Sequence, residues 1–232
     1  MIPAAVRDAE LPAGLVAIPV RTRLIRRGDD LAELLRDALR GTARPGDVVA
    51  IAETAVAIAQ GRFIGAETIR PSLLARVLAR RAGTLATVNQ PESLQLVIDD
   101  VGAWRVLGAA VAHVAARAAG KRGMFYHLLG DAVAAIAGYT GTLPPYERAI
   151  VLGPADPDRV SAELAAALGL HVAIVDANNL RRAKALGASP QLVREAVERA
   201  LLDNPHGNGD EQTPLVVLAW RGAGANPLVR AA

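Results

Sequence analysis

The stretch that decides the fold is Ala173-Ile174-Val175-Asp176-Ala177-Asn178-Asn179, in which an apolar run breaks into a carboxylate and two side-chain amides. The apolar run predicts a buried β-strand, and open α/β sheets bind ligands at the carboxyl ends of such strands. Asp176 is therefore the first candidate for a binding site. The alternative is that Asp176 only caps the turn that follows the strand.

The residues before this stretch predict a strand, a helix and a second strand. An apolar segment at 149–152 precedes Asp156-Pro157-Asp158, which is typical of a helix start, and Gly169 then marks the helix end. The connection is long enough for 149–152 and 172–175 to lie parallel, and a right-handed crossover would then be expected. The pattern indicates an α/β architecture.

The rest of the chain alternates between predicted strands and helices. Strands are expected at 16–20, 48–52 and 215–218, helices at 31–39, 54–60, 72–82, 91–101, 104–119 and 190–201, a hairpin around Gly130-Asp131, and a loose tail after Gly222. No internal repeat or long linker interrupts this order. One compact domain is the simplest expectation.

The composition excludes several classes of protein. Of the 232 residues 52% are hydrophobic and only 3% aromatic, so alanine, valine and leucine must fill the core. The absence of cysteine excludes thiolate catalysis and disulfides. The net charge is only +3 and the arginines are dispersed, which argues against nucleic-acid binding. Asp8 and Glu10 do not fit a signal peptide, and no segment favours a membrane span, so a cytoplasmic protein is expected.

Standard catalytic signatures are missing, so attention falls on clusters rich in oxygen ligands. The sequence has no Walker loop, no Gly-x-Gly-x-x-Gly after a strand and no histidine pair with metal-ligand spacing. Oxygen ligands suit magnesium, manganese and phosphate chemistry. The candidate clusters are Asp176 with Asn178 and Asn179, the loop from Asn204 to Thr213, and the Gly138–Thr142 segment. The last two can also be read as an ordinary loop and an ordinary turn.

Several segments together resemble the coenzyme F420-0:L-glutamate ligase family, the γ-glutamyl ligases. The resemblance rests on five segments in the right order: 18–31, 46–62, 138–158, 175–187 and 213–222. It implies a mixed α/β (α+β) fold with helices flanking a mixed sheet, forming one domain over 1–232 with 72–120 as a divergent, insertion-like block. It further implies an intertwined homodimer that uses GTP and Mg²⁺ or Mn²⁺ to form a γ-glutamyl amide bond on a small carboxylate substrate.

The resemblance also assigns roles to the candidate residues. Asp176 would be catalytic. The metal would be held by Asp176, Asp210 and Glu211, the nucleotide by Glu53, Thr54, Arg62, Asn178 and Asn179, and the substrate by Thr140, Gly141, Thr142, Asn204 and Asn208.

The departures from the family pattern leave a second function open. Thr54 and Ile58 stand where the family has lysines, Ala57 replaces a serine, and Thr140 replaces a metal-binding aspartate. Another acid would have to restore the lost ligand, and the candidates are Glu53, Asp100, Asp131, Asp210 and Glu211. The alternative is therefore a catalytically degenerate paralogue that binds a nucleotide or an anionic metabolite without ligase activity.

Overall fold

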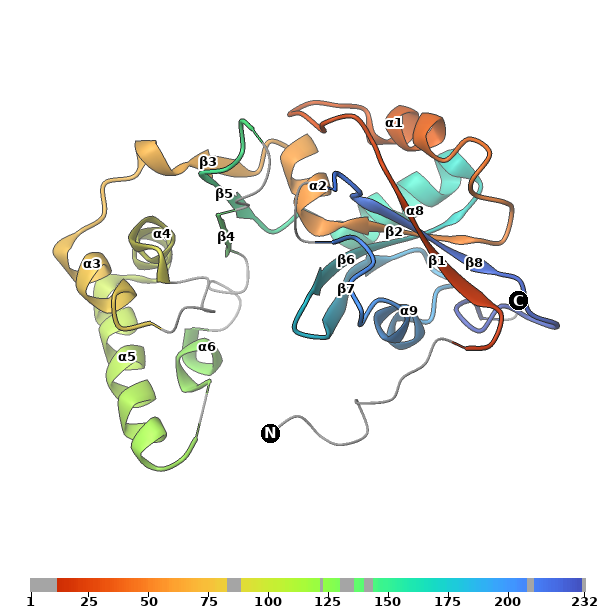
Figure 1. Cartoon of the computed structure of the whole chain (residues 1–232). Helices are drawn as coiled ribbons and strands as arrows, with labels where there is room; N and C mark the ends of the chain where they lie inside the picture. The colour runs from red at the N-terminus through yellow and green to blue at the C-terminus, as the bar shows by residue number, and fades with distance from the viewer. Residues whose placement is uncertain are drawn as a thin grey trace. The chain divides into compact units, whose positions relative to one another are not determined.

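The computed structural model describes residues 12–82, 89–121, 123–129, 136–139, 144–207 and 211–230 (Figure 1). The chain divides into two compact units. The first contains Met1–Gly61 and Pro154–Ala232, and the second contains Arg62–Gly153. The sequence suggested one domain with 72–120 as an insertion-like block. In the structure this block lies wholly within the second unit.

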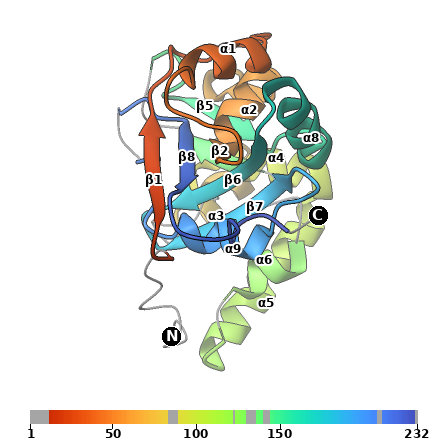
Figure 2. The ribbon, with the colours of Figure 1, turned by 90° about the vertical axis from the view of Figure 1, so that its right-hand side faces the viewer.

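A five-stranded mixed sheet forms the centre of the first unit. Its strand order is β1-β8-β2-β6-β7, which Figure 2 shows side by side. The bounds are β1 Leu15–Val20, β8 Leu215–Trp220, β2 Val48–Ala52, β6 His171–Asn178 and β7 Arg182–Ala188. Strands β2 and β6 are parallel, and the other neighbouring pairs are antiparallel. The central place of β2 explains why its residues 48–51 are all apolar and fully buried.

The predicted parallel pairing of 149–152 with 172–175 is wrong. Residues Ala149–Leu152 form strand β5 of a different sheet, and β6 takes β2 as its parallel partner instead. A strand-helix-strand pattern predicts only that a helix joins two strands. It does not determine whether the two strands belong to the same sheet. Here the chain leaves the first unit after Gly61 and returns at Pro154, so the two parallel strands are separated by the whole second unit.

Helices cover both faces of the five-stranded sheet (Figure 1). One face carries α1 Leu31–Ala38, α2 Glu53–Ala59 and α8 Pro157–Leu168, and the other carries α9 Arg194–Ala200. Helix α1 starts as predicted, because the Asp30 carboxylate accepts the backbone N–H groups of Ala32 at 2.8 Å and Glu33 at 3.1 Å. Val197 of α9 belongs to the same buried hydrophobic cluster as Ala173 and Val175 of β6. These layers leave the carboxyl ends of β2 and β6 at one edge of the sheet.

The second unit combines a small sheet with helices. The sheet order is β3-β5-β4, with β3 Phe63–Gly65 and β4 Ile136–Tyr139 both antiparallel to β5. The helical elements are the short 3-10 helix η2 Ala66–Thr68, then α3 Leu73–Ala79, α4 Pro91–Val101, α5 Ala103–Ala118 and α6 Met124–Leu129. The hairpin predicted here is wrong in its first arm, since 124–129 is helical. Its Gly130-Asp131 turn lies outside the described residues.

The predicted loose tail differs from the structure. Leu228 is 1% exposed, its carbonyl accepts the N–H of Val193 at 2.9 Å, and the N–H of Arg230 donates to Gln191 at 2.8 Å. The tail therefore packs beside α9 at least as far as Arg230. Across the described ranges, no helix is both long enough and apolar enough to cross a membrane.

Candidate functional site

Two carboxylates lie near each other where the parallel strands β2 and β6 approach their carboxyl ends. Ala52, the last residue of β2, is in register with Val175 of β6. Glu53 follows as the first residue of α2, and Asp176 lies within β6, just before its end. The charge of Asp176 contributes to the electrostatic environment of Glu53, so the two carboxyl groups are close. The sequence predicted both residues in the site, and the structure brings them together.

The Glu53 carboxyl is held in an unfavourable environment. Burial, and then the negative charge of Asp176, raise the pKa of Glu53 to about 7. Neither a hydrogen bond nor an ion pair reaches the Glu53 carboxyl from the residues that the structure describes. Partial burial also raises the pKa of Asp176, although its side chain keeps one exposed side and Lys184 opposes the change. A bound cation would relieve both carboxyls.

Lys184 completes this row of charges on the next strand. It lies directly opposite Asp176 in the antiparallel β6–β7 pair, so both side chains leave the same face of the sheet. Sequence analysis missed Lys184 as a site residue because it did not predict β7. The available signal was its place a few residues beyond the predicted strand end, in a segment that could fold back on β6.

The acid pair would supply two protein ligands to a divalent cation. No group of three or more histidine, aspartate or glutamate residues is close enough to hold a metal ion within the described ranges. Of the predicted metal ligands, Asp210 lies outside those ranges. Glu211 places its carboxyl against Gly207, where an added Cβ would meet Glu211 Cδ at 2.7 Å. The pair Glu53 and Asp176 therefore fits a divalent cation that takes its remaining ligands from substrate and water.

The predicted amide residues form a second cluster. The Asn204 side-chain amide donates to Asn179 Oδ1 at 2.8 Å, which joins a predicted substrate residue to a predicted nucleotide residue. The Asn178 Oδ1 accepts the N–H of Leu180 at 3.0 Å, so this amide shapes the turn between β6 and β7. Asn178 therefore has the local capping role that was the alternative for this stretch.

A buried histidine ties the 203–213 loop to the same sheet edge. The His206 Nδ1 lies 3.2 Å from the Thr213 carbonyl, and Thr213 Oγ1 donates back to the His206 carbonyl at 2.5 Å. The adjacent Pro214 accepts the N–H of Ala52, the last residue of β2, at 2.9 Å. Burial lowers the pKa of His206 to about 4, so its ring is neutral at physiological pH. Sequence analysis treated His206 only as an isolated histidine.

The remaining predicted site residues are separate or outside the description. Arg62 belongs to the second unit, where its Nε donates to the Gly153 carbonyl at 2.6 Å. Thr54 follows Glu53 in α2 and is half-buried. Four further residues fall outside the described residues: Thr140, Gly141, Thr142 and Asn208. Their assignments, and that of Arg62 to nucleotide binding, stay predictions.

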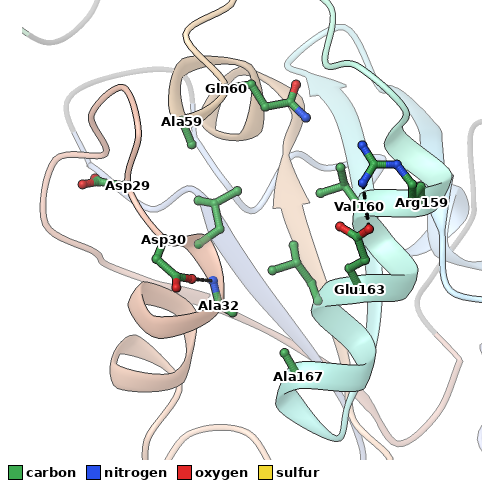
Figure 3. A pocket seen from close by; sticks show the side chains of 11 residues that line it. Asp29, Asp30, Ala32, Ala59, Gln60, Arg159, Val160, Glu163 and Ala167 are labelled. Carbon is green, nitrogen blue, oxygen red and sulfur yellow. Dashed lines mark hydrogen bonds and ion pairs between the residues drawn. The ribbon is translucent and has the colours of Figure 1, made fainter.

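A pocket of about 440 Å³ lies elsewhere on the first unit, between α1, the end of α2 and α8 (Figure 3). Its charged groups already have protein partners. Arg159 pairs with Glu163 at 2.7 Å, Asp29 pairs with Arg23 at 2.6 Å, and Asp30 caps α1. Arg23 accordingly lowers the pKa of Asp29. Because these polar groups are satisfied, the acid pair at the strand ends is the stronger candidate for chemistry.

Comparison with known proteins points to one family. The family model described as F420-0:Gamma-glutamyl ligase matches residues 19–189. The coenzyme F420:L-glutamate ligase of Methanopyrus kandleri is 33% identical over 142 residues, which cover 61% of this chain and 48% of that protein. The enzyme of the same name from Archaeoglobus fulgidus is 37% identical over 79 residues, 33% of this chain and 31% of that protein. The matches thus span about half or less of these curated relatives.

Proposed function

The chain belongs to the F420-0:Gamma-glutamyl ligase family, and from this premise we propose that it joins glutamate to a small carboxylate substrate through a γ-glutamyl amide bond. In the proposed reaction GTP phosphorylates the substrate carboxylate and releases GDP. The amine of glutamate then attacks the acyl phosphate and releases inorganic phosphate. The proposed enzyme acts as a cytoplasmic homodimer with Mg²⁺ or Mn²⁺.

The observation that carries this proposal is the pairing of Glu53 with Asp176. Asp176 is held by β6 and Glu53 by the start of α2, directly after the neighbouring strand β2, so the two carboxylates offer oxygen ligands from adjoining regular elements. Glu53 thereby supplies the second acid that the replacement of an aspartate by Thr140 would otherwise remove. When bound, the divalent cation would neutralise phosphate charge during the transfer.

The protein residues have separable roles in this proposal. Asp176 and Glu53 hold the cation, and the neutral His206 keeps the 203–213 loop attached to the edge through Thr213. The Asn179–Asn204 pair fixes the neighbouring turn and offers amide groups for hydrogen bonds to the nucleotide or substrate. No step requires proton transfer by a cysteine or by a charged histidine.

One observation favours the alternative of a binding protein without ligase activity. Ala57 and Ile58, at family positions for a hydroxyl and a cation, are 0% and 7% exposed and belong to the apolar side of α2. They cannot contact phosphate as a serine and a lysine could. Such a protein would bind the metal-nucleotide complex and stop before phosphate transfer.

The test combines turnover with binding. The purified chain is incubated with GTP, Mn²⁺, glutamate and the deazaflavin precursor, and the glutamylated product and GDP are measured. We expect product from the wild type and from Asp37→Asn, an exposed acid on α1, and at least 100-fold less from Asp176→Asn. Nucleotide binding without product would favour the alternative. The absence of metal-dependent nucleotide binding would contradict the ligase function.

A further inference from the structure

Lys184 lies beside the acid pair and forms no ion pair with either of its carboxylates among the described residues. It is exposed and lies directly across from Asp176, whose charge in turn acts on Glu53 at the start of α2. The three side chains thus come from β7, β6 and the helix that directly follows β2, as ammonium, carboxyl and carboxyl. No ion pair within 4.0 Å joins Lys184 to a described acid, although its charge opposes the rise in the pKa of Asp176. Its three N–H donors therefore remain available to a ligand.

The use of lysine at this position is unusual for this chain. Of its 26 basic residues only two are lysines, Lys121 and Lys184. Lys121 follows α5 in the second unit. An ammonium is a compact point charge on a flexible stem that can follow a phosphate group, whereas a guanidinium prefers a fixed planar fork. A compact cation beside two carboxylates suits a ligand that carries both a divalent metal and phosphate.

We propose that Lys184 binds the phosphate chain of a nucleoside triphosphate whose divalent cation is held by Glu53 and Asp176. This inference rests on the proposed function and adds a residue to it. Glu53 and Asp176 would hold the metal, and the ammonium of Lys184 on β7 would donate hydrogen bonds to the phosphate oxygens of the same ligand. Lys184 thereby returns a positive charge to a site where Thr54 and Ile58 of α2 supply none, and it does so from strand β7.

Calorimetry on the full chain separates this role from a structural one. Mn²⁺ alone and GTP with Mn²⁺ are titrated into the wild type, Lys184→Met, Lys184→Arg and Lys121→Met. For Lys184→Met we expect about tenfold weaker binding of GTP with Mn²⁺, the loss of one charge-assisted contact. Binding of Mn²⁺ alone should be unchanged or tighter, because a nearby positive charge has been removed. Lys184→Arg should lose less than threefold, and Lys121→Met should match the wild type.

The outcomes distinguish failure of this inference from failure of the proposed function. If Lys184→Met binds GTP with Mn²⁺ as tightly as the wild type does, the role of Lys184 is wrong and the metal site stands. If Lys184→Met weakens Mn²⁺ alone as much as it weakens GTP, Lys184 only supports the fold of the edge and the inference is again wrong. If the wild type binds no Mn²⁺, both the inference and the proposed function fail.

Discussion

The two ends of strand β2 carry acidic residues in opposite circumstances. Asp47 precedes the strand, and its buried carboxylate accepts hydrogen bonds from Arg221 at 2.8 and 3.2 Å and from the backbone N–H of Arg44 at 2.9 Å. Glu53 follows the strand, and within the described chain its carboxyl meets the negative charge of Asp176 in place of a cation. The same strand thus ends in a satisfied acid and an uncompensated one.

This difference separates a structural acid from a functional one. Burying a carboxylate costs free energy unless hydrogen bonds and an opposite charge offset the loss of water. At Asp47 the protein supplies both, so the residue anchors the start of β2 to the segment after β8. At Glu53 the described residues supply neither, and the cost is expressed as a pKa of about 7. Carboxyl groups left in this state are concentrated at binding and catalytic sites.

The largest effect on stability is expected when the compensated end is broken. Asp47→Ala removes the partner of Arg221 and leaves the N–H of Arg44 without its acceptor, so we expect the free energy of unfolding to fall by about 3 kcal/mol. Urea unfolding measures this change. The control is Asp37→Ala, which removes an exposed pair with Arg40 and should cost less than about 0.5 kcal/mol. An equal fall in the free energy of unfolding of Asp47→Ala and Asp37→Ala would contradict the structural role assigned to Asp47.

Next in size is the pH dependence that Glu53 introduces. The folded state holds the Glu53 proton up to pH about 7, whereas the unfolded state loses it near 4.5, so stability falls as the pH rises through this window. The full change is at most about 3 kcal/mol. Glu53→Gln should therefore match the wild type near pH 4 and exceed its free energy of unfolding by about 2 kcal/mol at pH 8. A difference between the two proteins that does not vary with pH would contradict this assignment.

His206 should oppose Glu53 over nearly the same range. Its folded pKa of about 4 lies below the usual 6.5, so stability is lost as the pH falls from 6.5 to 4. The two effects are similar in size and opposite in sign, and the wild-type profile should be nearly flat between pH 4.5 and 6.5. Urea unfolding of Glu53→Gln should show stability rising with pH, and His206→Gln should show it falling. If the free energy of unfolding of the two variants changed with pH in the same direction, the effects of Glu53 and His206 would not cancel and this prediction would be wrong.

The smallest effect concerns the coupling within the acid pair. Burial is the larger cause of the raised pKa of Glu53 and the charge of Asp176 is the smaller. Asp176→Asn should therefore lower the pKa of Glu53 by less than half of its elevation, as measured by NMR titration of the side-chain carboxyl without metal. A return of this pKa to 4.5 would mean that charge repulsion, and not burial, sets the state of Glu53.

The sequence was sufficient to predict individual helices and strands, but it was insufficient to predict which strands pair in a sheet. The apolar runs at 48–52 and 172–175 and the helical pattern at 31–39 predicted β2, β6 and α1 because these signals are local. The pairing of β2 with β6 could not be predicted, since the second unit lies between them in the chain. Strand β7 was missed because Arg182–Ala188 is rich in alanine and has no β-branched residue.

The candidate site was predicted in part for the same reason. Asp176 stood out because it follows an apolar run, and the family resemblance then brought in Glu53, whose environment the charge of Asp176 affects. Lys184 depends on the unpredicted β7, and the role of His206 depends on its contacts with Thr213. The pairing of Lys184 with Asp176 and the contacts of His206 with Thr213 both form because the chain folds back on itself. Hydrophobic periodicity in the sequence does not predict such contacts. The family resemblance itself is confirmed by the match over residues 19–189.

The most direct test of the central claim is calorimetric titration of Mn²⁺ into the wild type, Glu53→Gln and Asp37→Asn at pH 8, where the Glu53 carboxyl is largely ionised. If Glu53 and Asp176 together hold the cation, Glu53→Gln should bind Mn²⁺ at least tenfold more weakly than the wild type, and Asp37→Asn should bind it equally well. Binding by Glu53→Gln as tight as that of the wild type would contradict the account.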